Sequence, residues 1–241
     1  MSNKTACKFF FCFIPICGMI EKEVRKLAKC VIFCAGEFSG LLEPIEQDDL
    51  VIAADGGYTH TEKAGIYPQI ILGDFDSLGY VPKGAEVFPV EKDDTDAMLA
   101  ARKGLEAGCR EFLFYGGLEG PRLDHTVANF QTLQFLADRG AKGYLIGKNQ
   151  IVTVLQNETV QFEETATGTL SLFCMGKDAE GITLRGLKYT LTDGVLTAGF
   201  PLGVSNHFIG QAASVQVKQG SLLMIYHREN GLGERAEYEK A

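Results

Sequence analysis

The segment Gln69-Ile-Ile-Leu-Gly-Asp-Phe-Asp-Ser77 joins a short apolar run to a turn that carries two aspartates. A short continuous apolar run that ends at glycine is typical of a strand buried on both faces of a parallel sheet. Asp74 and Asp76 follow directly, and open α/β sheets bind their ligands at the carboxyl ends of such strands. The segment therefore predicts an α/β fold with a polar site at one edge of its sheet.

Similar apolar runs recur along the first two thirds of the chain. They occupy residues 30–35, 50–54, 111–115 and 143–146. Between them, residues 95–107 and 123–139 carry apolar side chains at helical spacing. This alternation predicts an α/β domain with a mostly parallel sheet over residues 29–156.

The pattern changes after Gln156. Residues 157–228 contain no helix-length periodic segment and predict an all-β sandwich domain. Phe200 and Phe208 are expected in its core, and the alternative is that they pack on the rings of a bound ligand. Residues 229–241 form a polar tail, and we expect the chain to fray from His227 onward. The predicted strands, which alternate in polarity between glycine-rich turns, are residues 160–162, 169–173, 182–184, 194–197, 213–217 and 221–226.

The composition limits the class of protein. Of the 241 residues, 46% are hydrophobic and 22% are charged, which is enough apolar content for a buried core. The formal net charge of -8 disfavours a nucleic-acid partner, because phosphate backbones select basic surfaces. The seven cysteines include no Cys-x-x-Cys pair, so structural zinc and a disulfide framework fit poorly. Reduced thiols predict a cytoplasmic protein.

Residues 9–20 form an apolar stretch that follows Lys4 and Lys8 and superficially resembles a signal peptide. The stretch is too short to span a bilayer, Pro15 interrupts it, and it lacks a small-x-small cleavage site. We therefore expect an ordinary start at Met19 and no membrane partner. Residues 1–28 are interpreted as an N-terminal extension and lead-in without a role in the fold.

Two acidic clusters indicate the chemistry. Asp74 and Asp76 form the first, and Asp93 and Asp96 belong to the second, Lys92-Asp-Asp-Thr-Asp96. Gathered carboxylates repel one another unless a cation lies between them, so the clusters predict a divalent metal, Mg2+, that holds a phosphate-bearing substrate. Residues two apart on an extended segment face the same way. We therefore expect Asp74 and Asp76 to point into one site while Phe75 turns back into the protein.

Each cluster also has a purely structural interpretation. An Asp-x-Asp turn after a strand is common, and a turn and a metal site account equally well for the first cluster. In the second cluster, Asp94 or Thr95 could cap the following helix, and Asp96 could complement its dipole. Capping does not account for three acids beside a lysine, however, and a helix start also suits a phosphate group.

A glycine-rich segment, Gly116-Gly-Leu-Glu-Gly-Pro-Arg-Leu-Asp-His125, joins another predicted strand to another predicted helix. Its glycines allow a ligand to approach the backbone closely, and Arg122 offers donors that match phosphate oxygens. The spacing is neither the dinucleotide fingerprint nor the Walker A loop. Arg122 and Asp124 are two apart and need not pair, and His125 is interpreted as a helix-packing residue.

At Asp55-Gly-Gly57, an acid before two glycines makes either a nucleotide contact or a turn.

Taken together, these motifs resemble the thiamine pyrophosphokinase family. The resemblance runs from Cys30 to Tyr226, and one departure is Pro121, where the family pattern has a second glycine before the arginine. The motifs occur in the family's order and are Asp55-Gly-Gly57, Gly73-Asp-Phe-Asp-Ser77, Lys92-Asp-x-Thr-Asp96, Gly116-Gly-x-x-Gly-x-Arg-x-Asp-His-Thr-x-x-Asn129 and Ser205-Asn206.

The resemblance implies a homodimeric enzyme that transfers pyrophosphate from ATP to the hydroxyl of thiamine, giving thiamine diphosphate and AMP. It places the active sites between the subunits, where Ser205 and Asn206 of the β domain would hold thiamine in the partner's site. The implied Mg2+ ligands, direct or through water, are Asp74, Asp76, Asp96 and Asp124, which form the catalytic set together with Arg122. The implied ATP-binding residues are Asp55, Gly56, Gly57, Lys92, Asp93, Thr95, Gly116, Gly117, Arg122 and Asn129.

Two alternatives belong to other functional classes. A Mg2+-ATP phosphotransferase that acts on a different small alcohol would share the aspartates and Arg122, but it would release ADP and give no reason for the Ser205-Asn206 loop. A thiamine- or nucleotide-binding module used for regulation would bind its ligand without turnover. The presence of every acidic motif residue argues against this second alternative.

Overall fold

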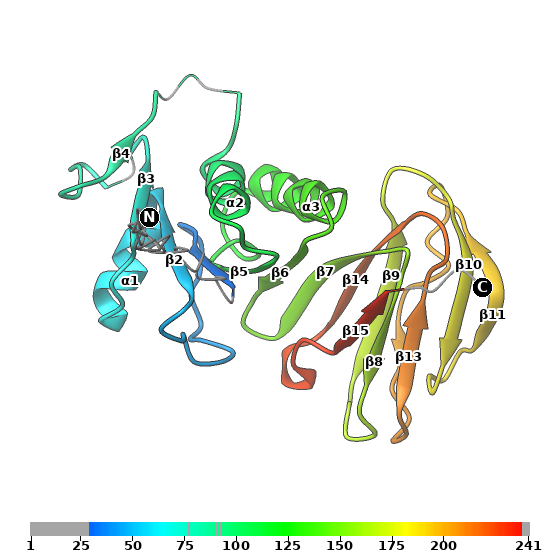
Figure 1. The fold of residues 1–241 in the computed structure, drawn as a ribbon. Helices are drawn as coiled ribbons and strands as arrows, with labels where there is room; N and C mark the ends of the chain where they lie inside the picture. The colour runs from blue at the N-terminus through cyan, green and yellow to red at the C-terminus, as the bar shows by residue number, and fades with distance from the viewer. Residues whose placement is uncertain (1–28, 77, 90, 92, 238–241) are drawn as a thin grey trace, which may run out of the picture.

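The main sheet of the fold has ten strands within the part of the chain that the structure describes (Figure 1). The structure is a computed structural model, and it describes residues 29–76, 78–89, 91 and 93–237. The strand order is β12-β9-β14-β7-β6-β5-β1-β2-β3-β4, in which β6 to β4 run parallel and the first four strands are antiparallel. The bounds are β1 Cys30–Phe33, β2 Leu50–Ala54, β3 Ile70–Gly73, β4 Glu86–Val87, β5 Glu111–Tyr115, β6 Lys142–Ile146, β7 Gln150–Gln156, β9 Thr169–Cys174, β12 Asn206–His207 and β14 Ser221–His227.

Two helices cover one face of the parallel strands. Helices α2 (Asp96–Glu106) and α3 (Leu123–Ala137) pack beside each other on this face (Figure 1). A short turn, η1 (Asp55–Gly57), leads from β2 into α1 (Tyr58–Ala64). The helices predicted at residues 95–107 and 123–139 are therefore confirmed, apart from their end residues.

The opposite face of the parallel strands is covered by a loop. Residues 34–49, here called the β1–β2 loop, contain no helix or strand. Their apolar side chains pack on the core that includes Phe33 and Tyr115. Since this core continues into the C-terminal half of the chain, the loop takes the place that a crossover helix would have. The loop side chains that pack there are Phe38, Leu41, Leu42 and Ile45.

A second, antiparallel sheet completes the predicted sandwich. Its strand order is β11-β10-β13-β8-β15. Its inward side chains, such as Val160 and Val215, share one core with Leu222 and Met224 of the main sheet. The α/β-plus-sandwich fold class is thus confirmed. The domain limit at residue 156 stays a prediction, because β7 pairs with both β6 and β14. The bounds are β8 Glu158–Phe162, β10 Ala179–Arg185, β11 Leu191–Leu196, β13 Ala213–Gln216 and β15 Glu234–Glu237.

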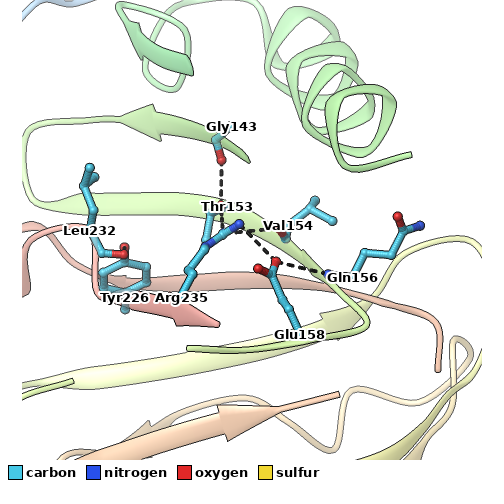
Figure 2. A network of polar contacts seen from close by, with 8 residues as sticks. All are labelled: Gly143, Thr153, Val154, Gln156, Glu158, Tyr226, Leu232 and Arg235. Carbon is cyan, nitrogen blue, oxygen red and sulfur yellow. Dashed lines mark hydrogen bonds and ion pairs between the residues drawn. The ribbon is translucent and has the colours of Figure 1, made fainter. Parts of the chain in front are cut away.

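The expected fraying of the chain after His227 is wrong for the described residues. Strand β15 pairs with β8, and its Arg235 side chain is only 2% exposed between the sheets (Figure 2). The Arg235 guanidinium contacts Glu158 at 3.0 Å, donates to the hydroxyl of Thr153 and lies 4.8 Å from the ring centre of Tyr144. A buried and paired arginine therefore anchors a segment whose composition is polar.

The predictions for residues 1–28, including the start at Met19, lie outside the described residues. No helix in the described part of the chain is both long and apolar enough to span a bilayer. The cysteines that the structure describes, Cys30, Cys34, Cys109 and Cys174, are free thiols.

Candidate active site

A cavity of about 560 Å³ opens at the carboxyl ends of the parallel strands. The ends of β1, β2, β3 and β5 and the starts of α2 and α3 surround it. This is the edge of the sheet at which the sequence predicts a site. The predicted residues that line the cavity together are Asp55, Asp74, Asp76, Thr95, Asp96, Gly116, Gly117, Arg122 and Asn129.

Three carboxylates meet in this cavity. Asp55, Asp74 and Asp96 are partly buried, and one oxygen from each lies within 4.8 Å of the other two. They come from η1, from the turn after β3 and from the first turn of α2. Three hard oxygen donors at this spacing fit a divalent cation such as Mg2+, which prefers carboxylates and phosphate oxygens. Among the described residues, this is the one group of three or more potential ligands with this spacing.

Asp55 is the member of the group that the sequence did not identify as a metal ligand. Its backbone has φ of 47°, and Gly73 packs against it so closely that an added Cβ would lie 2.9 Å from the Asp55 Cα. Only glycine fits there, because β2 and β3 approach each other at their ends. Asp55 directly follows β2, and β2 is the neighbour of β3, the strand that precedes Asp74. This position is the sequence signal that could have identified Asp55. Gly56 and Gly57 are buried in the same turn.

Asp74 and Asp76 line the same cavity, as expected, but they do not lie on an extended segment. Strand β3 ends at Gly73, and Phe75 has φ of 58° with its side chain buried, as expected. The Asp76 amide donates to Asp74 Oδ1 at 3.3 Å, and Asp76 is exposed. Because the left-handed residue breaks the period of two, Asp76 lines the cavity without joining the group formed by Asp55, Asp74 and Asp96.

Arg122 and Asp124 form a pair that their spacing does not require. Arg122 Nη2 lies 2.6 Å from Asp124 Oδ2, and Arg122 Nε donates to Asp124 Oδ1 at 3.3 Å. Arg122 is extended just before α3, while Asp124 lies in the first helical turn, so the two side chains meet across the helix start. The hydrogen bond from Arg122 lowers the pKa of the Asp124 carboxyl. Asp124 is thus paired with Arg122 and is not a member of the group formed by Asp55, Asp74 and Asp96.

Other side chains at the start of α3 shape the glycine-rich loop. Asn129 is buried, and its Nδ2 donates to the Gly117 carbonyl at 2.7 Å. The helix-packing interpretation of His125 is wrong, because this side chain is exposed at the cavity. Glu119 also lines the cavity and was missed, since a glutamate within a glycine-rich turn carries no distinctive spacing.

At the start of α2, the capping interpretation of the second acidic cluster is confirmed for Thr95, while Asp96 joins the group of three carboxylates. Thr95 caps the helix by accepting from the Met98 amide at 3.2 Å, and it also lines the cavity. Asp94 pairs with Arg102 at 3.1 Å. Asp93 is exposed, and Lys92 lies outside the described residues.

The predicted thiamine-binding residues lie at the other end of the main sheet. Asn206 belongs to β12, the edge strand opposite to β4. Its amide accepts from Tyr189 N at 2.9 Å and donates to Tyr189 O at 2.7 Å, and only 5% of the residue is exposed. Ser205, with φ of 59°, is exposed beside it. Within one chain, four strands therefore separate β12 from β5, the nearest strand that ends at the carboxylate cavity.

Large apolar side chains are exposed around Ser205. The prediction that Phe208 is a core residue is confirmed, whereas Phe200 is 65% exposed and the same prediction for it is wrong. Exposed apolar surface of this kind often marks an interaction site. The exposed apolar residues of this region are Tyr189, Val195, Phe200, Leu202, Val204 and Ile209.

Comparison with known proteins gives the same assignment for both halves of the chain. The family model "Thiamin pyrophosphokinase, catalytic domain" matches residues 42–145, and "Thiamin pyrophosphokinase, vitamin B1 binding domain" matches residues 157–222. A thiamine pyrophosphokinase of Bacillus subtilis (strain 168) is 30% identical over 189 residues, which is 75% of this chain and 88% of that protein.

Solved structures agree with the sequence relatives. The crystal structure of thiamine pyrophosphokinase from Bacillus subtilis superposes with a TM-score of 0.71 at 27% identity, covering 83% of this chain and 99% of that one. The crystal structure from Geobacillus thermodenitrificans gives a TM-score of 0.68 at 26% identity, covering 82% and 96%.

Proposed function

Since the chain belongs to the thiamine pyrophosphokinase family, we propose that its carboxylate cavity is where ATP and Mg2+ bind for catalysis. The activity is the transfer of pyrophosphate from ATP to the hydroxyl of thiamine, which gives thiamine diphosphate and AMP. The observation that carries the proposed site is the meeting of Asp55, Asp74 and Asp96 in one cavity at the starts of two helices. Helix starts favour phosphate groups, and grouped carboxylates favour a cation.

The donor set fits Mg2+. Asp55, Asp74 and Asp96 would hold the ion, with Asp76 and Asp124 as the further ligands, direct or through water, that the family pattern implies. The bound ion would neutralise charge on the phosphate oxygens during transfer. The α2 start, capped by Thr95, and the α3 start, beside Arg122, direct positive potential toward the same cavity.

Attack by the thiamine hydroxyl requires that a group accept its proton and that the nucleophile be aligned with the β-phosphorus. Asp74 and Asp96 are the candidates for this base, because both carboxylates face the cavity. Arg122 would stabilise charge on the moving group through its fork of donors. The proposed nucleotide contacts are Asp55, Gly56, Gly57, Lys92, Asp93, Thr95, Gly116, Gly117, Arg122 and Asn129, of which Lys92 lies outside the described residues.

We further propose that the enzyme is a homodimer whose thiamine sites lie between the subunits. Asn206 is on the edge strand β12 and Ser205 directly precedes it, with four strands between β12 and β5, the nearest strand that ends at the cavity, so a partner's copy would have to supply them. The exposed apolar side chains around Ser205 support an interface there. Light scattering coupled to gel filtration should give twice the chain mass, and a monomer under assay conditions would contradict the proposal.

A cytoplasmic location, where thiols stay reduced, suits the free cysteines among the described residues.

The decisive experiment is to incubate the protein with ATP, Mg2+ and thiamine and to separate the products. We expect AMP and thiamine diphosphate in equal amounts, and chelation of the metal should stop the reaction. ADP would instead indicate transfer of a single phosphoryl group. Ligand binding measured by calorimetry without any turnover would indicate a regulatory binding module.

A further inference from the structure

The β1–β2 loop forms one wall of the cavity. Cys34, Ala35 and Gly36 line it, and no helix stiffens the segment that follows. A wall built from irregular backbone can hold a ligand in one position only if other groups fix that backbone. The contacts that fix this loop therefore bear directly on binding in the cavity.

The first set of contacts comes from the α/β half of the chain. Gly36 N donates to Gly116 O at 2.9 Å, and Glu37 N donates to Glu119 O at 3.0 Å. The loop and the glycine-rich segment are so close that a Cβ on Gly36 would lie 2.2 Å from Glu119 O. His60 of α1 contacts the Gly36 carbonyl through Nε2 at 2.7 Å, which makes this nitrogen the donor.

The second set of contacts comes from the end of the C-terminal half. Arg228 begins η2 (Arg228–Asn230), directly after β14. Its Nη2 donates to Gly40 O at 2.7 Å, and its Nη1 donates to Ser39 O at 3.3 Å and to Gly147 O at 3.0 Å. One guanidinium thus holds carbonyls of the β1–β2 loop and of the β6–β7 turn together through two separate nitrogens in a rigid plane, a geometry that the compact ammonium of lysine does not reproduce.

The β6–β7 turn is itself bonded to the glycine-rich segment, which also lines the cavity. The Lys148 amide donates to both carboxylate oxygens of Glu119, at 2.9 and 3.0 Å, and Glu119 lines the cavity. The Arg228 amide also donates to Asn149 O at 3.0 Å. Arg228 is therefore connected to the β1–β2 loop directly and to the glycine-rich segment through the turn.

We propose that Arg228 is a positioning residue for nucleotide binding. Its side-chain hydrogen bonds reach no cavity-lining residue, but they hold the β1–β2 loop, whose residues 34–36 line the cavity, and the β6–β7 turn, which is bonded to the cavity residue Glu119. This inference rests on the proposed function, because it assumes that the cavity binds ATP. It assigns to the C-terminal half of the chain a role in ATP binding in addition to its role in binding thiamine.

The test compares Arg228→Met with Arg228→Lys in the full-length enzyme. Methionine keeps the length of the side chain without its donors, and we expect the KM for ATP to rise about tenfold, with kcat changed less than about threefold. The KM for thiamine should stay unchanged. Arg228→Lys should give an intermediate KM, because its ammonium keeps the charge and three donors but not the spacing of two separate nitrogens. Hydrogen exchange of a peptide spanning residues 35–42 should become faster in Arg228→Met.

Arg235→Met is the matched control. Arg235 also lies in the C-terminal segment and also donates to a backbone carbonyl, that of Val154, but none of its recorded contacts involves a cavity loop (Figure 2). Its replacement should lower stability and leave the KM for ATP unchanged. If Arg228→Met, like Arg235→Met, lowers stability and leaves the KM for ATP unchanged, Arg228 has no positioning role.

Two results would overturn the inference. One is an Arg228→Met enzyme with a wild-type KM for ATP, and the other is unchanged exchange of residues 35–42. If Arg228→Met does not fold, Arg228→Lys carries the same comparison. Failure of the proposed function appears separately, as a wild-type enzyme that forms no AMP, and the exchange measurement made without ATP still tests whether Arg228 holds the loop.

Discussion

Charged groups are arranged in opposite ways in the two halves of this molecule. At the cavity, Asp55, Asp74 and Asp96 bring like charges together while remaining partly open to solvent. Inside the sandwich, Arg235 is almost fully buried and faces an opposite charge, Glu158, whose side chain is 13% exposed (Figure 2). The first arrangement places like charges close together, whereas in the second the removal of either partner would leave a buried charge without compensation.

The contrast separates the residues that serve binding from the residues that serve stability. A repulsive group persists in a folded protein when a ligand compensates it, so its members should be replaceable without loss of stability. A buried pair contributes to the fold, so its members should be replaceable only at a cost to stability. Substitutions in the two regions should therefore move activity and stability independently.

The largest expected effect belongs to the cavity. Asp55→Asn and Asp74→Asn should each lower kcat by roughly 10³-fold, because each removes a charge that would hold the cation and the phosphates. Melting temperatures should be unchanged or slightly higher, since repulsion is reduced. The measurements are AMP production with saturating Mg2+ and thermal unfolding.

Asp193→Asn is the control for these variants. Asp193 makes an ion pair with Lys218 on the sandwich surface at 2.7 Å, and exposed pairs contribute little. Near-normal turnover of Asp55→Asn beside an inactive Asp74→Asn would remove Asp55 from the metal site and return it to the nucleotide contact that the sequence suggested.

The next effect tests the other side of the comparison. Arg235→Met should lower the free energy of unfolding by about 3 kcal/mol, because it leaves the Glu158 carboxylate without its buried partner. The double variant Arg235→Met/Glu158→Gln should recover part of this loss. Urea titration gives both values, while kcat per folded molecule should stay within about twofold of the wild type. A loss of stability below about 1 kcal/mol would show that the buried pair does not anchor β15.

The fold was largely predictable because its strongest signals are local. The apolar runs that became β1, β2, β3, β5 and β6 and the periodic segments that became α2 and α3 need no knowledge of distant contacts. Strand β15 was missed for the opposite reason. Its residues are polar, and it is held by pairing with β8 and by the buried side chain of Arg235, neither of which leaves a periodic pattern.

The site was predictable as a list of residues but not as a geometry. Asp74 and Asp96 meet as their positions after a strand and at a helix start suggest. The left-handed backbone of Phe75 leaves Asp76 at the cavity but outside the group of three carboxylates, and the turn before α3 brings Arg122 onto Asp124. Both outcomes depend on single backbone angles, which residue spacing does not specify.

A third prediction concerns Asn206, which the C-terminal half is proposed to contribute to the thiamine site. Asn206→Ala should raise the KM for thiamine roughly tenfold, because the removed amide also holds the backbone of Tyr189 in place. A stability loss of about 1 kcal/mol should accompany it, since two partly buried backbone groups lose their partner. Unchanged thiamine affinity would exclude Asn206 from the thiamine site.

Mixing two defective subunits tests whether that site spans the dimer. In a mixed dimer of Asp74→Asn and Asn206→Ala chains, one shared site carries both substitutions and the other carries neither. Random exchange of equal amounts should therefore restore roughly a quarter of wild-type activity at low thiamine concentration. Activity no higher than the average of the two separate variants would place Asn206 in the site of its own chain.

The smallest effect is at Glu111, at the end of β5 remote from the cavity. Burial raises the pKa of the Glu111 carboxyl, and the charge of Glu43 raises it further, while Lys142, Lys29 and Arg235 act in the opposite direction. A raised pKa in the folded state means that this group favours folding at low pH and that the contribution is lost as pH rises through the folded pKa. Glu111→Gln should therefore raise the melting temperature slightly at about pH 8 and have no such effect at about pH 4, with turnover unchanged. A lower melting temperature at the higher pH would show that attraction to Lys142 and Lys29 outweighs burial, and Glu111 would then belong with Arg235 among the paired charges that stabilise the fold.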